Sequence, residues 1–238
     1  YDFKFSLGIE NGHYPPKKRI ENNLIDVFLY KPELYSGKGR IPQIVIPEIK
    51  SCADGLSNII DSVFGKLTIP KEKFLFLGRT YECENQASMD IMVLESISKM
   101  VGKDNIAMVY SSLSEDVSNL YALHGYHVIS DLSAPWALAM LSKEIDDKVL
   151  LSAEASLLVL PYLLCGKKIR TISLINIMKL SRMWYYDVPE YQACLRKFQN
   201  VINDSDSDSQ MRSFSPGSTL ELYKTMQYIV GGFDGQYD

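Results

Sequence analysis

Residues 131–166, DLSAPWALAMLSKEIDDKVLLSAEASLLVLPYLLCG, contain the pattern that decides the fold of this chain. Val149 to Leu151 predict a short buried strand, Ser152 to Ser156 a turn of small and hydroxyl residues, and Leu157 to Cys165 a helix. In an open α/β sheet, this order places the first amides of the helix at the carboxyl end of the strand, where they face a bound anion. The stretch therefore predicts a binding site for a ligand of the nucleotide type.

The same alternation of strands and helices continues on both sides of this stretch. Strands are predicted at Phe74–Leu77, Ile106–Tyr110, His127–Ser130, Val149–Leu151 and Ile169–Leu174. Helices are predicted between them at Gln86–Met100, Glu115–His124, Pro135–Ser142 and Ala155–Cys165. Apolar strands joined by helices need cover on both faces of the sheet, so the pattern predicts a Rossmann-like parallel sheet with flanking helices over residues 67–180.

The segments on either side of this Rossmann-like half are organised differently. Before it, strands are predicted at Phe3–Ile9, Ile25–Tyr30 and Gln43–Ile49, followed by a helix at Asp54–Phe64. After it, helices are predicted at Val188–Val201 and Thr219–Val230. We therefore expect residues 1–66 to be part of an N-terminal strand-rich lobe, 67–180 to be the Rossmann-like domain, and 181–238 to hold C-terminal helices.

Residues 203–218, NDSDSDSQMRSFSPGS, join the two C-terminal helices. Alternating Asp and Ser are typical of calcium-binding loops, but the glycine and the distal glutamate of that pattern are missing. We therefore expect a flexible, solvated loop here rather than a metal site.

Composition and charge exclude several classes of protein. The 238 residues are 46% hydrophobic and 23% charged, which is typical of a soluble globular protein with a full core. The net charge of −4 argues against a general nucleic-acid binder, because phosphate backbones attract basic surfaces. The longest apolar run, Leu157 to Leu164, is much shorter than the roughly 20 residues that span a bilayer, and the N-terminus lacks the pattern of a signal peptide.

The four cysteines are widely spaced and form no C-x-x-C pair. This spacing is typical of a reduced cytoplasmic protein rather than of a disulfide scaffold or a zinc site. Because the chain begins without Met and runs directly into a strand-like segment, we also expect residues to precede it.

Small and polar residues follow the first four predicted strands of the Rossmann-like half. These strand ends are Gly78-Arg79-Thr80, Ser111-Ser112, Asp131 to Pro135, and Ser152 to Ser156. Because the carboxyl ends of parallel strands meet at one edge, their hydroxyls and amides could hold a phosphate and a sugar without a metal. The alternative is that each serine or glycine only caps a helix or forms a turn.

Glu10 and His13 form a second candidate site, in the stretch GIENGHY at residues 8–14. A carboxylate directly after a strand could act as general base on an acceptor hydroxyl, and the histidine is the second candidate for that role. The alternative is structural, because Asn11-Gly12 is a strong hairpin-turn signal that would leave Glu10 solvated.

Trp136 and the basic run at residues 17–19 each allow two interpretations, and several common catalytic motifs do not occur in the sequence. Trp136, directly after Pro135, either anchors the start of a helix or forms the wall of a base or sugar pocket. The basic run KKR at residues 17–19 could meet an anionic acceptor or a membrane surface, although a solvated loop is the simpler interpretation. The motifs G-x-G-x-x-G, Walker A, H-E-x-x-H and G-x-S-x-G do not occur, which argues against dehydrogenases, P-loop NTPases, zincins and serine hydrolases.

Several motifs resemble one family of enzymes. KFLFLGR at 73–79, APWALAML at 134–141 and DDKVLLSAEASLLVLPYLLCGKK at 146–168 occur in that order. They resemble the C-terminal half of bacterial sialyltransferases of the lipooligosaccharide and polysialic-acid type, including glycosyltransferase family 52. Upstream, GIENGHY and IDVFLYKPELY resemble the acidic-glycine motif of that family and the strand after it, so the resemblance extends over residues 7–174.

The resemblance implies a GT-B fold, in which two Rossmann-like domains face each other across a cleft. It implies inverting transfer of sialic acid from CMP-sialic acid, a nucleotide-sugar donor, to the hydroxyl of a saccharide or glycolipid acceptor, with no metal or other cofactor. Carried over by position, Glu10 would be the base, Ser152 and Ser156 would hold the donor phosphate or carboxylate, and Gly78 and Arg79 would border the nucleotide.

This chain departs from the family pattern at important positions. The family has a His-Pro pair after the second strand of this half, where the histidine stabilises the departing phosphate, but this chain has Tyr110, Ser111 and Ser112. Either serine could donate a hydrogen bond but not a positive charge. Ala137 stands where glutamate often follows the Pro-Trp pair, and the chain is too short for two complete domains.

These departures leave two alternatives open. The first is a catalytically impaired relative that serves as a binding or regulatory module, and the second is a nucleotide-sugar epimerase of the same two-lobed architecture. A cytoplasmic protein is expected in each case, with peripheral contact at the inner face of the membrane as an alternative.

Overall fold

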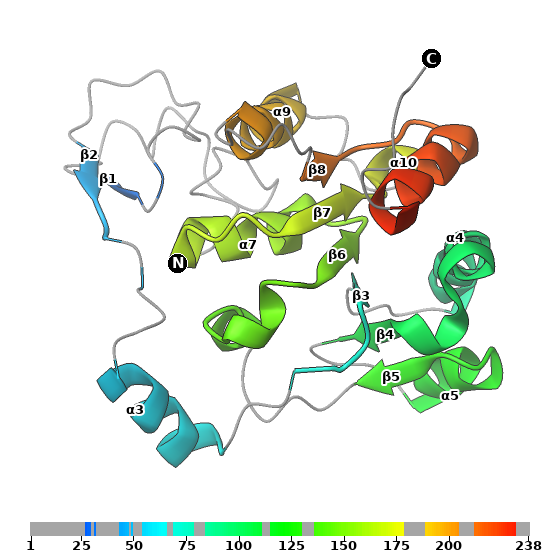
Figure 1. Cartoon of the computed structure of the whole chain (residues 1–238), viewed down its shortest axis with the longest axis horizontal. Helices are drawn as coiled ribbons and strands as arrows, with labels where there is room; N and C mark the ends of the chain where they lie inside the picture. Colours follow the sequence, from blue (N-terminus) through cyan, green and yellow to red (C-terminus); the bar gives the residue numbers. More distant parts are fainter. Residues whose placement is uncertain are drawn as a thin grey trace.

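Figure 1 shows the computed structural model of the chain, which describes residues 27–29, 31, 43–47, 49, 54–65, 69–78, 84–110, 115–129, 136–178, 189–204 and 212–231. A six-stranded sheet lies at its centre, and every neighbouring pair of strands is parallel. Helices cover both faces of this sheet. The expected α/β fold with a parallel sheet and flanking helices is therefore confirmed.

Six strands form this sheet, and all but the last of them agree closely with those expected from the sequence. They are β3 (Phe74–Leu77), β4 (Ile106–Val109), β5 (His127–Ile129), β6 (Val149–Ser152), β7 (Arg170–Ser173) and β8 (Ser213–Phe214). Their spatial order is β5-β4-β3-β6-β7-β8. Numbered from β3, this is the order 3-2-1-4-5-6 of doubly wound nucleotide-binding sheets, and it reverses direction between β3 and β6.

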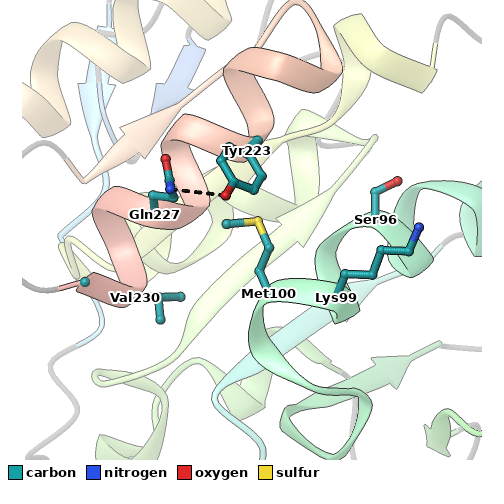
Figure 2. Close-up of a pocket in the computed structure, with 7 residues that line it drawn as sticks. Ser96, Lys99, Met100, Tyr223, Gln227 and Val230 are labelled. Atoms are coloured by element: carbon teal, nitrogen blue, oxygen red, sulfur yellow. Dashed lines mark hydrogen bonds between the residues drawn. The ribbon is translucent and has the colours of Figure 1, made fainter.

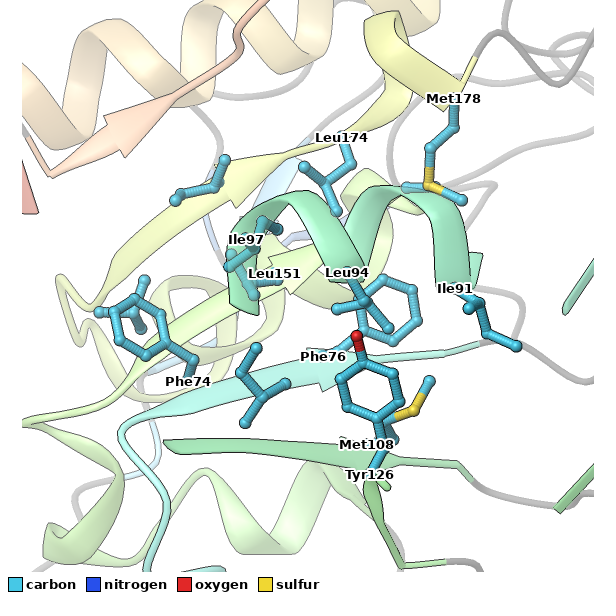
Figure 3. Packing of buried hydrophobic residues seen from close by; sticks show 14 of the residues in the cluster. Phe74, Phe76, Ile91, Leu94, Ile97, Met108, Tyr126, Leu151, Leu174 and Met178 are labelled. Carbon is cyan, nitrogen blue, oxygen red and sulfur yellow. The ribbon is translucent and has the colours of Figure 1, made fainter. Parts of the chain in front are cut away.

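Three long helices pack on one face of the sheet, which we call the α4 face. They are α4 (Glu84–Val101), α5 (Glu115–Leu123) and α10 (Thr219–Gly231), and the single turn α8 (Ile175–Met178) lies with them. Figure 3 shows side chains of α4 above strand residues of this face, including Ile91, Leu94, Ile97, Phe74, Phe76 and Leu151. Strand side chains alternate between faces, so the residues between these core positions point to the other side.

The opposite face, which we call the α7 face, is covered by α7 (Ala155–Cys165) together with α6 (Trp136–Ala139) and the 3-10 turn η3 (Lys143–Ile145). Leu75 and Leu77 of β3 and Leu150 of β6 pack here with Leu158 of α7. A helix was expected over residues 135–142, but α6 ends at Ala139 and turns follow, so that prediction is wrong for its second half.

Gly166 ends α7 as a left-handed residue, with a φ of 66°. Its amide donates to the Tyr162 carbonyl over 2.9 Å, and the next amide, of Lys167, donates to the Pro161 carbonyl over 3.2 Å. A side chain at this φ would be strained, so glycine is the residue that allows the chain to leave the helix and enter β7.

The described N-terminal residues include a small second sheet. In it β1 (Val27–Leu29) pairs in parallel with β2 (Gln43–Val45), and α3 (Asp54–Phe64) follows. The Ile49 amide donates to the Leu164 carbonyl over 2.7 Å, which ties this segment to α7. The strand predicted at residues 3–9 lies outside the described residues. No described helix combines the length and the apolarity needed to cross a membrane.

The loop predicted at residues 203–218 contains a strand instead at Ser213–Phe214, so the prediction is wrong there. Asn203, near the end of α9 (Pro189–Asp204), holds this strand by its side chain. Its Oδ1 accepts from the Arg212 and Ser213 amides over 2.9 Å each, and its Nδ2 donates to the Ser213 carbonyl over 3.0 Å. A carboxamide on another element thus supplies the hydrogen bonds that local sequence composition does not reveal.

We predict that Asn203→Ala lowers the free energy of unfolding by about 1–3 kcal/mol, because it leaves backbone groups of β8 without partners. Urea denaturation followed by circular dichroism measures this change. Asn105→Ala is the control, since the Asn105 side chain donates one bond, to the exposed Val101 carbonyl, and its loss should cost much less. Equal losses for the two variants would contradict the anchoring role of Asn203.

Glu72 and His127 form an ion pair near the amino ends of β3 and β5, with 2.8 Å between Oε1 and Nδ1. Burial by itself raises the pKa of Glu72, but a backbone hydrogen bond and the His127 ring outweigh it and hold the pKa below the ordinary value of 4.5. The carboxylate therefore stabilises the fold above its unfolded pKa, and this contribution is lost as the pH falls through the folded value.

We predict that Glu72→Gln is less stable than the wild type at pH 7 and that the difference shrinks as the pH is lowered below about 5. Unfolding in urea at a series of pH values from about 7 to 3 measures it. Glu144→Gln changes an exposed side chain and is the matched control. A difference between Glu72→Gln and wild type that stays constant with pH would refute the ion-pair explanation.

Candidate functional site

The strand order reverses between β3 and β6, and ligands of open α/β sheets bind outside the carboxyl ends of the strands at such a point. Three residues expected at the site lie around this reversal. Gly78 follows β3, Ser152 ends β6, and Trp136 packs against the core of the α7 face, which includes Leu77 at the end of β3. The structure thus brings these three residues to the same region of the sheet.

Ser152 connects the two halves of the sheet at this point. Its hydroxyl donates to the Leu77 carbonyl over 2.7 Å and accepts from the Glu154 amide over 3.0 Å. Its own carbonyl accepts from the Leu174 amide over 2.8 Å, and only 1% of the residue is exposed. A serine hydroxyl has one hydrogen to donate, and Ser152 uses it in the bond to the Leu77 carbonyl. The hydroxyl therefore positions the strand end and the turn into α7 rather than donating to a ligand.

The start of α7 lies directly after this turn. Glu154, the residue before the helix, has an extended backbone and makes no side-chain hydrogen bond to cap it. The amino end of a helix carries a partial positive charge and presents amide groups, so an uncapped start favours an anion. This helix start is therefore the strongest candidate for binding a phosphate or a carboxylate.

The α4 face of the reversal point is filled by Tyr110, the residue after β4. A Cβ atom on Gly78 would lie 1.9 Å from the Tyr110 ring, so only glycine fits beneath this ring. The Tyr110 hydroxyl donates to Asp90 Oδ2 over 3.3 Å, and the hydroxyl of Tyr121 donates to the same atom over 3.1 Å. Asp90 is fully buried, so these bonds fix the ring in place.

The same cluster explains the ionisation state of Tyr121. Burial and the neighbouring Asp90 carboxylate raise the pKa of Tyr121 far above its ordinary value of 10. The Tyr121 ring stacks on the Tyr110 ring, with 5.5 Å between centroids. The Tyr121 hydroxyl therefore keeps its proton and remains a hydrogen-bond donor to Asp90 throughout the neutral pH range.

Trp136 lies on the α7 face, as the first residue of α6. Its ring packs against the buried cluster that contains Leu77 and Val109, the last residues of β3 and β4. The indole Nε1 is buried and has no hydrogen-bond partner among the residues that the structure describes. A buried donor without a partner costs about 1–3 kcal/mol, and a ligand with an acceptor at this position would satisfy it.

Ser173, the last residue of β7, was not among the residues expected at the site. It is 1% exposed, and its hydroxyl also finds no hydrogen-bond partner in the described part of the chain. The sequence contained a signal that could have identified it, because Thr171 and Ser173 alternate on one face of a strand expected to be buried on both. Buried hydroxyls normally have hydrogen-bond partners, so the unpaired hydroxyl of Ser173 calls for a physical explanation.

The remaining expected site residues are not placed by the structure. Glu10, His13, Arg79, Ser111, Ser112 and Pro135 lie outside the described residues, and so does the side chain of Ser156. In the part of the chain that is described, no three His, Cys, Asp or Glu side chains lie close enough together to hold a metal ion.

Figure 2 shows a hollow of about 650 Å³ between α4 and α10. Residues that line it include Ser96, Lys99, Met100, Tyr223, Gln227 and Val230. The three α4 residues, Ser96, Lys99 and Met100, lie in the last two turns of that helix, which runs back from the carboxyl to the amino edge of the parallel sheet. The hollow is therefore remote from the reversal point and does not belong to the candidate site.

Comparison with known proteins adds no relative of this chain. No family model matches the sequence, and neither curated proteins nor solved structures provide a match. The function must therefore be inferred from the geometry of the chain itself.

We predict that Gly78→Ala lowers the free energy of unfolding by about 1–3 kcal/mol, because the new methyl group overlaps the Tyr110 ring. A double-mutant cycle with Tyr110→Leu tests this, since a side chain without the ring relieves the overlap. We expect Tyr110→Leu to lower the free energy of unfolding less in the Gly78→Ala background than in the wild type. Additive costs would show that the Tyr110 ring is not the obstacle.

Proposed function

We propose that this chain binds a nucleotide-sugar donor at the carboxyl edge of its sheet and is a sialyltransferase-like glycosyltransferase of GT-B-like architecture. The observation that carries the proposal is the reversal of strand order between β3 and β6 beside the uncapped start of α7. A phosphate at the helix start would be stabilised by backbone amides and by the helix dipole.

The Tyr110 ring on the α4 face and the helix start on the α7 face together favour a donor with a single phosphate. Dinucleotides bind with their pyrophosphate over the turn after the first strand, which in this chain begins at Gly78. The Tyr110 ring, fixed by Asp90, covers that glycine. The α7 face instead offers one helix start and the free Nε1 donor of Trp136, which suit a nucleoside monophosphate linked to a sugar, as in CMP-sialic acid.

The proposed reaction follows from this placement. The acceptor hydroxyl attacks the anomeric carbon and passes its proton to the carboxylate of Glu10, with His13 as the second candidate for this role. The bond from that carbon to the phosphate oxygen breaks, CMP leaves with the electron pair, and the configuration inverts. Donors fixed at the start of α7 would stabilise the growing charge on the phosphate.

The other expected residues keep their proposed roles. Arg79, Ser111, Ser112 and Pro135 would border the nucleotide, and Ser156 would add a hydroxyl in the first turn of α7. The acceptor would be a cell-surface saccharide or glycolipid. The protein would accordingly act in the cytoplasm, or at the inner face of the membrane where such acceptors are assembled.

A binding or regulatory module is the second candidate function. It is favoured by the residue that follows β4, where the resembled family has a histidine to stabilise the leaving phosphate. Here that residue is Tyr110, and its hydroxyl is directed to Asp90 instead of to the α7 face. Such a module would bind the nucleotide and transfer no sugar.

We predict that CMP binds the full chain with a Kd of about 10–100 µM, as measured by isothermal titration calorimetry. Trp136→Phe keeps an aromatic ring and removes the Nε1 donor, and it should weaken CMP binding about fivefold through the loss of one hydrogen bond. NAD serves as the control ligand and should bind at least about tenfold more weakly than CMP, which corresponds to about 1.4 kcal/mol. The proposal fails if CMP, UDP and their sugar conjugates all fail to bind.

A transfer assay with CMP-sialic acid and saccharide acceptors then separates the candidate functions. A glycosyltransferase should form product only with an acceptor, and Glu10→Gln should lose transfer while keeping CMP affinity. Nucleotide binding without transfer would identify a module. A changed sugar without any acceptor would identify a nucleotide-sugar epimerase.

A further inference from the structure

Ser173 belongs to the last row of side chains on the α7 face, at the carboxyl edge of the sheet. Its backbone is in register with Ser152 of β6, so the two side chains point to the same face. Figure 3 shows Leu151 and Leu174, the neighbours of these serines along the chain, with the core of the opposite, α4 face. The two serine hydroxyls therefore point toward the layer that holds α7.

The two serines lie beside the start of α7. The Ser152 hydroxyl accepts from the amide of Glu154, the residue that precedes the helix. Since Ser173 is the lateral neighbour of Ser152, its hydroxyl lies near this helix start, on the side away from β3. Both β6 and β7 pack against α7, which places the helix above the pair.

Within the described part of the chain, the Ser173 hydroxyl differs from the other buried hydroxyls of this part of the sheet because it has no hydrogen-bond partner. Ser152 donates to the Leu77 carbonyl, and Thr171 donates to the hydroxyl of Ser213 over 2.9 Å. Ser173 is just as deeply buried, at 1% exposure, but its hydroxyl has no hydrogen-bond partner among the described residues. The hydroxyls of Ser152, Thr171 and Ser213 are thus hydrogen-bonded, and that of Ser173 is not. Because buried polar groups are normally hydrogen-bonded, the Ser173 hydroxyl is a candidate donor to a ligand.

We propose that the Ser173 hydroxyl donates a hydrogen bond to an oxyanion that is lodged at the start of α7. This inference rests on the proposed nucleotide function and adds to it the position of the anionic group, over β6 and β7 rather than over the turn after β3. Only a small group such as a phosphate oxygen reaches a serine this deeply buried. The nucleoside and the sugar of the donor therefore lie farther out along the edge.

Two chemical properties of the site agree on this ligand class. A helix start supplies amide donors and positive potential, which favour a negative charge, and the unpaired hydroxyl supplies one more donor for an oxygen of the same group. Phosphate and carboxylate share this chemistry, and the test below separates a nucleotide phosphate from free inorganic phosphate.

The test compares Ser173→Ala with Thr171→Val in the full chain. Without ligand, Ser173→Ala removes a buried group that has no partner and should raise the melting temperature by about 2–4 °C. Thr171→Val removes the donor to Ser213 and should lower it. A fall for Ser173→Ala as large as that for Thr171→Val would overturn the inference, because it would mean that the Ser173 hydroxyl is already bonded in the free protein.

Calorimetry with cytidine, CMP and inorganic phosphate completes the test. Ser173→Ala should weaken CMP and phosphate binding about five- to tenfold and leave cytidine affinity unchanged, while Thr171→Val should leave all three unchanged. Equal CMP affinity in wild type and Ser173→Ala, or an equal loss for cytidine, would overturn the inference. If the wild type binds no nucleotide, the proposed function fails, and phosphate decides the inference: a loss of its binding in Ser173→Ala supports it, and unchanged or absent binding refutes it.

Discussion

The parallel pairing of β3 with β6 joins the two halves of the sheet, and most of the structure depends on it. Phe74, Leu75 and Phe76 are in register with Val149, Leu150 and Leu151, and all six side chains are buried. Because the order of strands reverses at this pair, the connections leave it in opposite directions and cover opposite faces. The Ser152 hydroxyl closes the pair at its carboxyl end by its bond to Leu77, so one constraint sets both the core and the candidate site.

At the carboxyl edge of the sheet, the α4 face and the α7 face differ in whether their buried polar groups are hydrogen-bonded. On the α4 face, the Asp90 carboxylate receives the hydroxyls of Tyr110 and Tyr121, and a bonded polar cluster of this kind rigidifies its surroundings. On the α7 face, the Trp136 Nε1 and the Ser173 hydroxyl are buried without a partner among the described residues, and α7 begins without a side-chain cap. Unbonded donors oppose folding, so their concentration on one face is the physical argument for a ligand there.

Local patterns predicted the regular elements well where burial is continuous. The strand Phe74–Leu77 and the helix Ala155–Cys165 have the predicted bounds, because an apolar run between turn residues is a local signal. The strand at Ser213–Phe214 was missed, since its polar surroundings are typical of a loop and its hydrogen bonds come from Asn203 and β7. The candidate site was predicted in part: Gly78, Ser152 and Trp136 meet at one edge, but Ser173 was regarded only as strand.

The sequence by itself determined the class of fold, and it predicted the edge of the sheet at which we propose that a ligand binds. Those properties follow from the periodicity of apolar residues and from the polar residues after each strand, and both are local along the chain. Only the tertiary structure decided which strands are neighbours and that the Tyr110 ring covers Gly78. It also decided that the Ser152 hydroxyl donates to the Leu77 carbonyl, whereas the Ser173 hydroxyl has no partner among the described residues. These facts depend on contacts between residues distant in sequence, and no local pattern encodes which donor finds an acceptor.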